Sequence, residues 1–153
     1  MEIKVNILLD DLIEIFDGNN QSFVCDKNCI KNDEFLKIVA VSDGVAVGYA
    51  VLYQGNDFLE REGFPFKANI KGENIYVWHC ITRNGFENKG VQTEIYNYFT
   101  NKFKDCDIYS VVDEVNIPSI KLHNKFNFKV VGTFEKFYSN KLCKFNLLKR
   151  DKL

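Results

Sequence analysis

The sequence predicts a mixed α/β (α+β) fold, with helices flanking a central sheet in which some strands are parallel. Two observations support this prediction. Two apolar β-type runs are joined by the turn Ser42-Asp43-Gly44, which is typical of an antiparallel hairpin. Two further β-type runs, 74–82 and 107–112, are separated by a helical stretch, which is typical of a parallel crossover. The length of 153 residues suits one domain over 1–153, and the 46% of apolar residues can form its core.

The first half of the chain predicts strands, one early helix and a long excursion. Ile3, Val5 and Ile7 alternate with polar residues, as in a half-buried strand. Residues 54–73 contain several glycines and Pro65, which favour an irregular connection with a turn of helix at 58–62. The elements expected here are a strand at 2–7, a helix at 8–16, a loop or short helix at 21–33, and strands at 35–41 and 45–53.

The second half predicts one buried strand, two helices and a final hairpin. Both faces of the run 74–82 are largely apolar, so this strand is expected at the centre of the sheet. Asn116 is a good N-cap, and Pro118 fits the first turn of the helix that follows. The other elements expected here are a helix from 90 to 103, a strand at 107–112, and hairpin strands at 128–137 and 142–148.

The composition excludes several classes of protein. The formal net charge is −1 and no segment is densely basic, so we expect no nucleic-acid partner. The five cysteines do not have the spacing of a zinc site, so we expect reduced thiols and no metal. We see no signal peptide and no apolar run of membrane-spanning length, so we expect a cytoplasmic protein without a membrane partner.

The segment 75–103 contains a strand, a loop and a helix, and this order favours anion binding. A helix that begins near Gly90 directs its free N–H groups into the loop 83–93, where a diphosphate is the natural guest. Gly90 lets a phosphate approach the backbone, Lys89 can add a charge and Thr93 a hydroxyl. A plain tight turn has the same pattern, so the loop alone leaves both interpretations open.

A second motif favours the anion-binding interpretation. The segment from Asn116 to Phe128 reads Asn-Ile-Pro-Ser-Ile-Lys-Leu-His-Asn-Lys-Phe-Asn-Phe. It resembles the motif Asn-x-x-Ser/Ala-x-x-Leu-Tyr-x-x-x-Gly-Phe of the GNAT N-acetyltransferases, and the element order resembles that family from about 35 to 148. The resemblance implies a GNAT-like sheet with splayed parallel strands. It also implies transfer of an acetyl group from acetyl-CoA to a primary amine without a metal.

The resemblance also implies where acetyl-CoA binds. The pantetheine arm would pair with the backbone of the central strand, and the diphosphate would rest on N–H groups of the loop. Asn116 and the helix after it, with Ser119, would flank the cofactor. The cofactor-binding residues expected on this basis are Cys80, Ile81, Thr82, Glu87, Asn88, Lys89, Gly90, Val91, Gln92, Thr93, Asn116 and Ser119.

Four positions depart from the pattern of the family. Glu87 brings a carboxylate near the expected diphosphate, so it has to point away. Gln92 stands where a small residue is usual, and Asn127 stands for a glycine, whose left-handed conformation asparagine tolerates. His123 stands for the tyrosine that can protonate the departing thiolate, and its ordinary pKa of roughly 6.5 suits a proton donor. The alternative is a polar residue on a half-exposed helix.

Direct transfer also needs a base for the amine and a donor for the developing oxyanion. His79 is the first candidate base, and a backbone N–H near Ile81 is the candidate donor. Strand alternation places His79 on the face opposite Trp78. Asp113 and Glu114 are the other candidate bases, and a purely structural histidine is the alternative for His79. Trp78 and Tyr76 either wall an acceptor pocket or belong to the core.

Two functions remain open at this stage. The first is an N-acetyltransferase whose acceptor is a small-molecule or peptide amine, bound by 54–73 and the final hairpin. The second is a catalytically weak GNAT-like domain that senses acyl-CoA or binds a partner. A flavodoxin-like domain fits less well, because two hairpins disagree with its parallel sheet. Strand edges in the final hairpin would also allow a homodimer.

Overall fold

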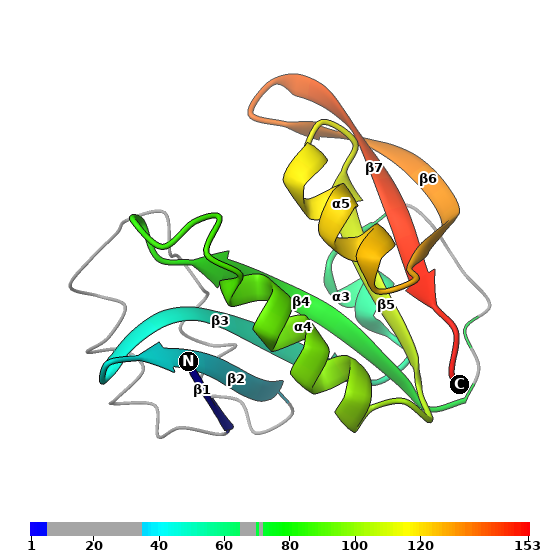
Figure 1. The fold of residues 1–153 in the computed structure, drawn as a ribbon. Coiled ribbons are helices and arrows are strands. Elements are labelled where there is room, and N and C mark those ends of the chain that lie inside the picture. Colours follow the sequence, from blue (N-terminus) through cyan, green and yellow to red (C-terminus); the bar gives the residue numbers. More distant parts are fainter. Residues whose placement is uncertain (6–34, 65–69, 71) are drawn as a thin grey trace. The chain divides into compact units, whose positions relative to one another are not determined.

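The computed structural model describes residues 1–5, 35–64, 70 and 72–153 (Figure 1). The predicted helix at 8–16 and the segment 21–33 lie outside the described residues. The described elements are β1 (Glu2–Val5), β2 (Phe35–Ser42), β3 (Val45–Gln54), α3 (Phe58–Arg61), β4 (Asn74–Thr82), α4 (Val91–Lys102), β5 (Asp107–Asp113), α5 (Ile117–Lys125), β6 (Lys129–Tyr138) and β7 (Lys141–Arg150). Each element predicted from Phe35 onward is present, and the mixed α+β class is confirmed.

The first compact unit comprises residues 1–53 and 77–101. Its strands lie in the order β1-β2-β3-β4, with β1 and β3 antiparallel to β2. Gly48 lets α4 pack closely on β3, since a Cβ at this position would lie 2.5 Å from Val91 Cγ1. It would also lie 3.1 Å from the carbonyl oxygen of Ile81 on β4. A glycine is therefore needed where α4 meets the two strands.

The second unit comprises residues 54–76 and 102–153. Its strands lie in the order β4-β5-β7-β6, so β7 lies between β5 and β6 and is antiparallel to both. Two aromatic residues of the segment 54–64 pack against these strands. Phe58 of α3 stacks on Tyr76 with ring centroids 4.4 Å apart, and Phe64 lies 4.9 Å from Phe134 of β6. The excursion therefore contributes aromatic side chains to the core of this unit.

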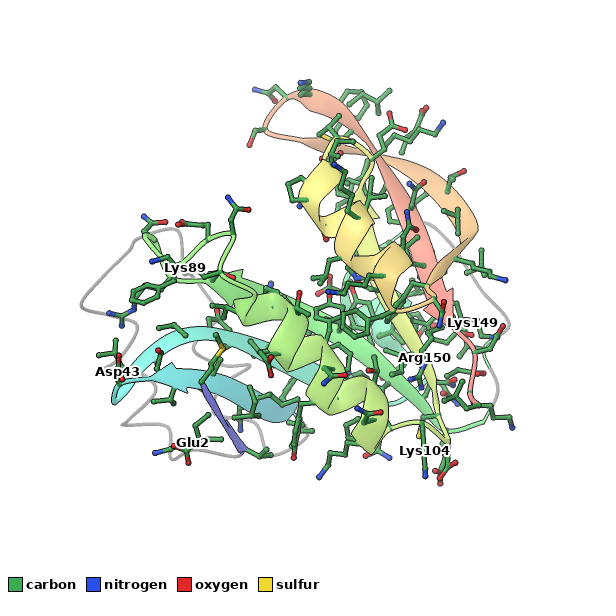
Figure 2. All side chains as sticks on the ribbon, viewed as in Figure 1. Glu2, Asp43, Lys89, Lys104, Lys149 and Arg150 are labelled. Carbon is green, nitrogen blue, oxygen red and sulfur yellow. The ribbon has the colours of Figure 1, made fainter. Side chains whose placement is uncertain are left out.

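A buried arginine closes the same unit at the end of β7. Arg150 is only 5% exposed, and its guanidinium donates hydrogen bonds to the carbonyl oxygens of Phe103 and Cys106, at 2.8 and 3.2 Å. These carbonyls belong to the connection between α4 and β5. Buried cationic side chains need such acceptors, because an uncompensated charge in the interior is costly. Figure 2 shows Arg150 at this end of the chain.

Both hairpin turns have the backbone that the sequence predicts. Asp43 and Gly44 have φ values of 51° and 76°, and Ser139 and Asn140 have values of 51° and 62°. Two successive residues with positive φ are characteristic of a type I′ turn, whose twist matches that of the strands. Asn127, after α5, has a φ of 64°, so asparagine adopts the left-handed conformation here in place of glycine.

Candidate active site

The first turn of α4 presents backbone N–H groups that have no acceptor among the described residues. The hydrogen bond from Glu94 N to Gly90 O, at 3.0 Å, is the first of the helix. The N–H groups of Val91, Gln92 and Thr93 come before it and bond to no described residue. Gly90 has a φ of 78°, and a Cβ there would meet nothing within 4 Å. The start of α4 is therefore open and electropositive, as an anion site requires.

Lys89 adds a positive charge to this loop. Its side chain is exposed, and its Nζ lies 5.3 Å from the centroid of the Phe86 ring. Figure 2 shows Lys89 on the loop that leads into α4. The ring holds the lysine loosely, since such contacts are worth about 0.5–1 kcal/mol at exposed sites. The ammonium group therefore remains available to an anion in solution.

The carboxylate of Glu87 bonds within its own loop. Its Oε2 accepts a hydrogen bond from the backbone N–H of Gly85 at 2.8 Å. This bond holds the carboxylate on the turn before the helix, and the carboxylate accepts none of the N–H groups at the start of α4. The carboxylate of Glu87 therefore does not occupy the N–H groups at the start of α4.

The side chain of Gln92 folds back toward the sheet. Its Nε2 donates a hydrogen bond to Thr82 Oγ1 at 3.2 Å, while its Oε1 is buried and accepts no hydrogen bond from a described residue. The amide also packs beside Gly48, where a Cβ would lie at an ordinary contact distance of 3.6 Å from Nε2. The glutamine therefore fits a position where the family has a small residue.

Trp78 lies on the face of the sheet that points away from α4. Its ring centroid is 5.0 Å from that of Phe35 and 5.8 Å from that of Tyr53. Side chains alternate between the two faces of a regular strand, and Tyr53 lies an odd number of residues after Gly48 in a regular part of β3. The two residues therefore occupy opposite faces. Gly48 faces α4, as its distance to Val91 shows. Trp78 therefore faces the other way.

The alternation of side chains between the two faces of β4 is interrupted just after Trp78. Cys80 Sγ lies 3.7 Å from Tyr96 Oη of α4, and Thr82 bonds to α4 through Gln92. Strict alternation would put Trp78, Cys80 and Thr82 on one face, so one residue is inserted between them, as in a β-bulge. The rings of Trp78 and His79 lie 6.5 Å apart, which is the distance of neighbours on one face.

The position expected for His79 from alternation was therefore wrong. Alternation placed His79 opposite Trp78, whereas the structure brings both rings to the face away from α4. The physical reason is the extra residue, which shifts the two-residue period by one position. The sequence gives no sign of it, because both faces of β4 are apolar.

The thiol of Cys80 remains protonated at neutral pH. Burial raises the pKa of Cys80 to about 12, and the hydrogen bond with Tyr96 offsets only part of this rise. A thiol must lose its proton to act as a nucleophile. Cys80 is therefore unsuited to a covalent acyl intermediate.

In the second unit, Asn116 caps α5 as the sequence predicts. Its Oδ1 accepts a hydrogen bond from the backbone N–H of Ser119 at 3.3 Å, and Pro118 occupies the first turn. Asp113 and Glu114, two of the candidate bases, also lie here. Asp113 Oδ1 accepts from the N–H of Val115 at 3.1 Å, and Glu114 lies 4.0 Å from Lys144 Nζ.

His123 is buried, with hydrogen bonds at both ring nitrogens. Its Nδ1 lies 2.7 Å from the carbonyl oxygen of Ser119, and its Nε2 lies 3.0 Å from Ser110 Oγ on β5. A carbonyl only accepts, so Nδ1 carries the proton and Nε2 accepts from the serine hydroxyl. Burial lowers the pKa of His123. The residue is only 2% exposed, whereas the other residues of α5 are exposed or half-buried.

The predicted cofactor-binding residues thus fall into two groups. Cys80 to Thr82 and the loop 87–93 lie together in the first unit, whereas Asn116, Ser119 and His123 lie in the second. Sequence reasoning missed the role of Gly48 in accommodating α4. An isolated glycine within an apolar strand is the signal that could have revealed it, because such a glycine often marks a close approach.

Two kinds of site find no support among the described residues. No described helix has both the length and the apolar character that crossing a membrane requires. In the same part of the chain, histidine, cysteine and carboxylate side chains form no group of three that could hold a metal ion.

Comparison with known proteins identifies the fold. A model of the acetyltransferase (GNAT) family matches residues 6–128. A search of curated sequences finds no match. Among solved structures, Arabidopsis thaliana NAA60 with a bisubstrate analogue has a TM-score of 0.69 at 15% identity, covering 97% of each chain. The ribosomal-protein-S18-alanine N-acetyltransferase of Escherichia coli has a TM-score of 0.70 at 9% identity, covering 97% of this chain and 92% of that one.

A third structure adds a different kind of acceptor. The aminoglycoside N-acetyltransferase AAC(6')-Iy in complex with CoA has a TM-score of 0.65 at 17% identity. The match covers 92% of this chain and 99% of that one. At these identities the likeness establishes the fold, and the acceptors in these names belong to those proteins.

Proposed function

Because this chain belongs to the GNAT acetyltransferase family, we propose that it transfers an acetyl group from acetyl-CoA to a primary amine by direct attack. The observation that supports this most is the start of α4. There the N–H groups of Val91, Gln92 and Thr93 have no described acceptor, and Gly90 keeps the approach open. Such a group of N–H donors at a helix start suits a diphosphate.

The residues of the first unit fit the cofactor. In this proposal the N–H groups from Asn88 to Thr93 hold the diphosphate, and the Lys89 ammonium adds a charge. The backbone of Cys80, Ile81 and Thr82 pairs with the pantetheine arm at the end of β4. Neither departure in the loop hinders this fit, because the Glu87 carboxylate is held by Gly85 and the Gln92 amide by Thr82.

Acetyl-CoA supplies a thioester, and the chain would have to orient the amine and move its proton. In the proposed step the amine nitrogen attacks the carbonyl carbon, the C–N bond forms and the C–S bond breaks with its electron pair going to sulfur. His79 accepts the proton that the amine loses. The backbone N–H of Ile81 is proposed to stabilise the oxygen as negative charge develops on it. The released thiolate takes its proton from a donor or from water.

The role of His123 as proton donor to the thiolate stays a prediction, and the environment of the residue argues against it. An acid for the thiolate would have to be the imidazolium form. Burial lowers the pKa of His123, so this form is scarce near neutral pH. Both nitrogens are also occupied, by Ser119 and Ser110. A positioning role, in which His123 ties α5 to β5, agrees better with this arrangement.

The acceptor is proposed to be a small-molecule or peptide amine. The relatives of similar fold act on a ribosomal protein and, by name, on an aminoglycoside, so the fold accommodates both kinds. The expected cytoplasmic location and homodimer stay predictions as well.

The test of the proposal begins with binding and proceeds to turnover. The melting temperature with and without acetyl-CoA reports binding, and CoA thiol release with a panel of amines reports transfer. Gly90→Asp is expected to abolish the melting shift, because a carboxylate would then face the diphosphate. Gly44→Asp is the matched control, since Gly44 has a φ of 76° and its Cβ would also meet nothing within 4 Å.

Two outcomes would count against the proposal. If acetyl-CoA produces no melting shift in the unaltered protein, the cofactor is wrong. If a shift occurs without thiol release for any amine, the chain binds acetyl-CoA as a sensor and transfer is wrong. Equal acetyl-CoA affinity in Gly90→Asp and Gly44→Asp would place the diphosphate elsewhere than the start of α4.

A further inference from the structure

Trp78 differs from the two aromatic residues that hold it. Phe35 and Tyr53 are each 5% exposed, whereas Trp78 is half-buried. The Trp78 ring makes an angle of 85° with Phe35 and 68° with Tyr53, and these two rings lie 5.4 Å from each other. The indole is thus fixed by two buried rings while part of it stays accessible.

The bulge in β4 brings a second functional group beside this indole. His79 follows Trp78 on the same face, with ring centroids 6.5 Å apart at an angle of 66°. Without the bulge the imidazole would point toward α4. One face of β4 therefore presents an electron-rich ring next to an imidazole.

We propose that Trp78 binds the acceptor amine as its ammonium ion, through a cation–π contact, beside His79. His79 takes one proton from the ammonium ion and leaves the neutral amine, and the second proton, lost from nitrogen after attack, passes to the departing thiolate or to water. Alkyl amines carry a proton at neutral pH, as the ordinary lysine pKa of about 10.4 illustrates. Tryptophan is the side chain that attracts such cations most strongly, and a ring held by packing pays little entropy to do so. The acceptor class is thus an alkylammonium ion, and its use in transfer rests on the proposed function.

The protein offers a direct readout, because Trp78 is the only tryptophan in the chain. Its fluorescence can be titrated with choline, which carries a trimethylammonium group and has no acetylatable nitrogen. The matched probe is 3,3-dimethylbutan-1-ol, which has the same shape without the charge. Free N-acetyltryptophanamide, titrated in parallel, corrects for collisional quenching.

We expect saturable quenching or a wavelength shift with choline, at a Kd about 2-fold to 30-fold lower than for the neutral alcohol. Equal affinity for the two probes, or no saturable signal from choline, would overturn the proposal. This titration uses the unaltered protein, so its result does not depend on whether a tryptophan variant folds.

A second experiment measures the consequence for turnover. Trp78→Leu is expected to raise the amine KM by about 2-fold to 30-fold with the acetyl-CoA KM unchanged, and Trp78→Phe is expected to fall between. Parallel increases in both KM values would mean that Trp78 serves packing alone and would overturn the specificity role. The melting temperature of each variant identifies those that do not fold.

Failure of this inference can be distinguished from failure of the proposed function. Gly90→Asp is expected to lose acetyl-CoA binding while choline still perturbs Trp78. A melting shift with acetyl-CoA, together with equal choline and alcohol affinities, would refute the ammonium site and leave the transferase proposal standing. A choline-selective signal without any acetyl-CoA binding would refute the transferase proposal and leave the ammonium site standing.

Discussion

The side-chain amide of Gln92, in the first turn of α4, donates a hydrogen bond to the hydroxyl of Thr82 at the end of β4, at 3.2 Å. This bond joins the strand proposed to carry the pantetheine arm to the helix proposed to carry the diphosphate. It also turns a bulky side chain away from the N–H groups of the helix.

The first prediction concerns this bond. Gln92→Ala is expected to lower the free energy of unfolding by about 1 kcal/mol, because one partly buried hydrogen bond is lost. Acetyl-CoA affinity is expected to change little, because the amide points back to the sheet. Urea denaturation measures the first effect and calorimetric titration the second. A double-mutant cycle with Thr82→Val isolates the pair, and a coupling energy near zero would contradict the bond.

The second prediction concerns the close approach of α4 to β3. Gly48→Ala is expected to destabilise the protein by about 1–3 kcal/mol, because the new Cβ would lie 2.5 Å from Val91 Cγ1 and 3.1 Å from the Ile81 carbonyl oxygen. Thermal and urea unfolding measure the loss. The double variant Gly48→Ala with Val91→Ala removes the nearer of the two contacts. It should recover part of what Gly48→Ala loses, and strict additivity would argue against the predicted clash.

The third prediction concerns Glu62, which follows α3. Its Oε2 accepts a hydrogen bond from Tyr76 Oη at 3.2 Å, and burial raises the pKa of this carboxyl despite that bond and the charge of Lys136. Glu62→Gln keeps an acceptor for the tyrosine and removes the buried charge. We expect the variant to be more stable at pH 7, by about 0.5 kcal/mol or more.

The sign of the pH dependence follows from the raised pKa of Glu62. A carboxyl whose folded pKa lies above its unfolded value favours the folded state at low pH, and this advantage is lost as the pH rises through the unfolded and then the folded pKa. The difference between Glu62→Gln and the unaltered protein should therefore grow from about pH 4 to pH 7. Urea unfolding at several pH values measures it. The exposed Glu60→Gln is the control, and an equal gain there would contradict the prediction.

The fourth prediction concerns His123. Because burial lowers its pKa in the folded state, the unfolded chain binds more protons, and stability should fall as the pH drops below about 6.5. His123→Phe is expected to remove this component. The same change should cost about 1–3 kcal/mol at pH 8, since the buried Ser110 loses its partner. His79→Asn serves as the control, because it leaves the buried histidine in place.

Kinetics of the same variant separates the two roles of His123. The acid role inferred from the motif predicts that His123→Phe lowers kcat more than it weakens acetyl-CoA binding. The positioning role predicts that turnover of the folded variant stays within a small factor and that its pH profile keeps its shape. A lost basic limb in the kcat profile would support the acid and contradict the positioning role.

Elements that are determined by local sequence signals were predicted from the sequence. The hairpin strands around Asp43-Gly44 were predicted within about one residue of their bounds, and the helix after Asn116 begins where its N-cap was predicted, because both follow local rules. The turn before α4 was predicted for the same reason, because a glycine followed by a helix is a local signal.

The rest depends on contacts between distant positions. The bulge at Trp78 and His79 leaves no trace in the sequence, since a strand with two apolar faces has no polar residue to mark its phase. The direction of the Gln92 side chain depends on its hydrogen bond with Thr82 of β4, which a local loop pattern does not include. The burial of His123 likewise depends on Ser110, which the helix motif does not include.

The placement of β7 between β5 and β6 affects how the protein can be made. A ribosome delivers β6 before β7, so β6, an edge strand of the described sheet, emerges before the strand with which it pairs. Phe134, which is buried in the folded protein, stays exposed to other molecules until residue 150 has left the exit tunnel. Translation arrested within β7 should therefore leave a product that chaperones retain.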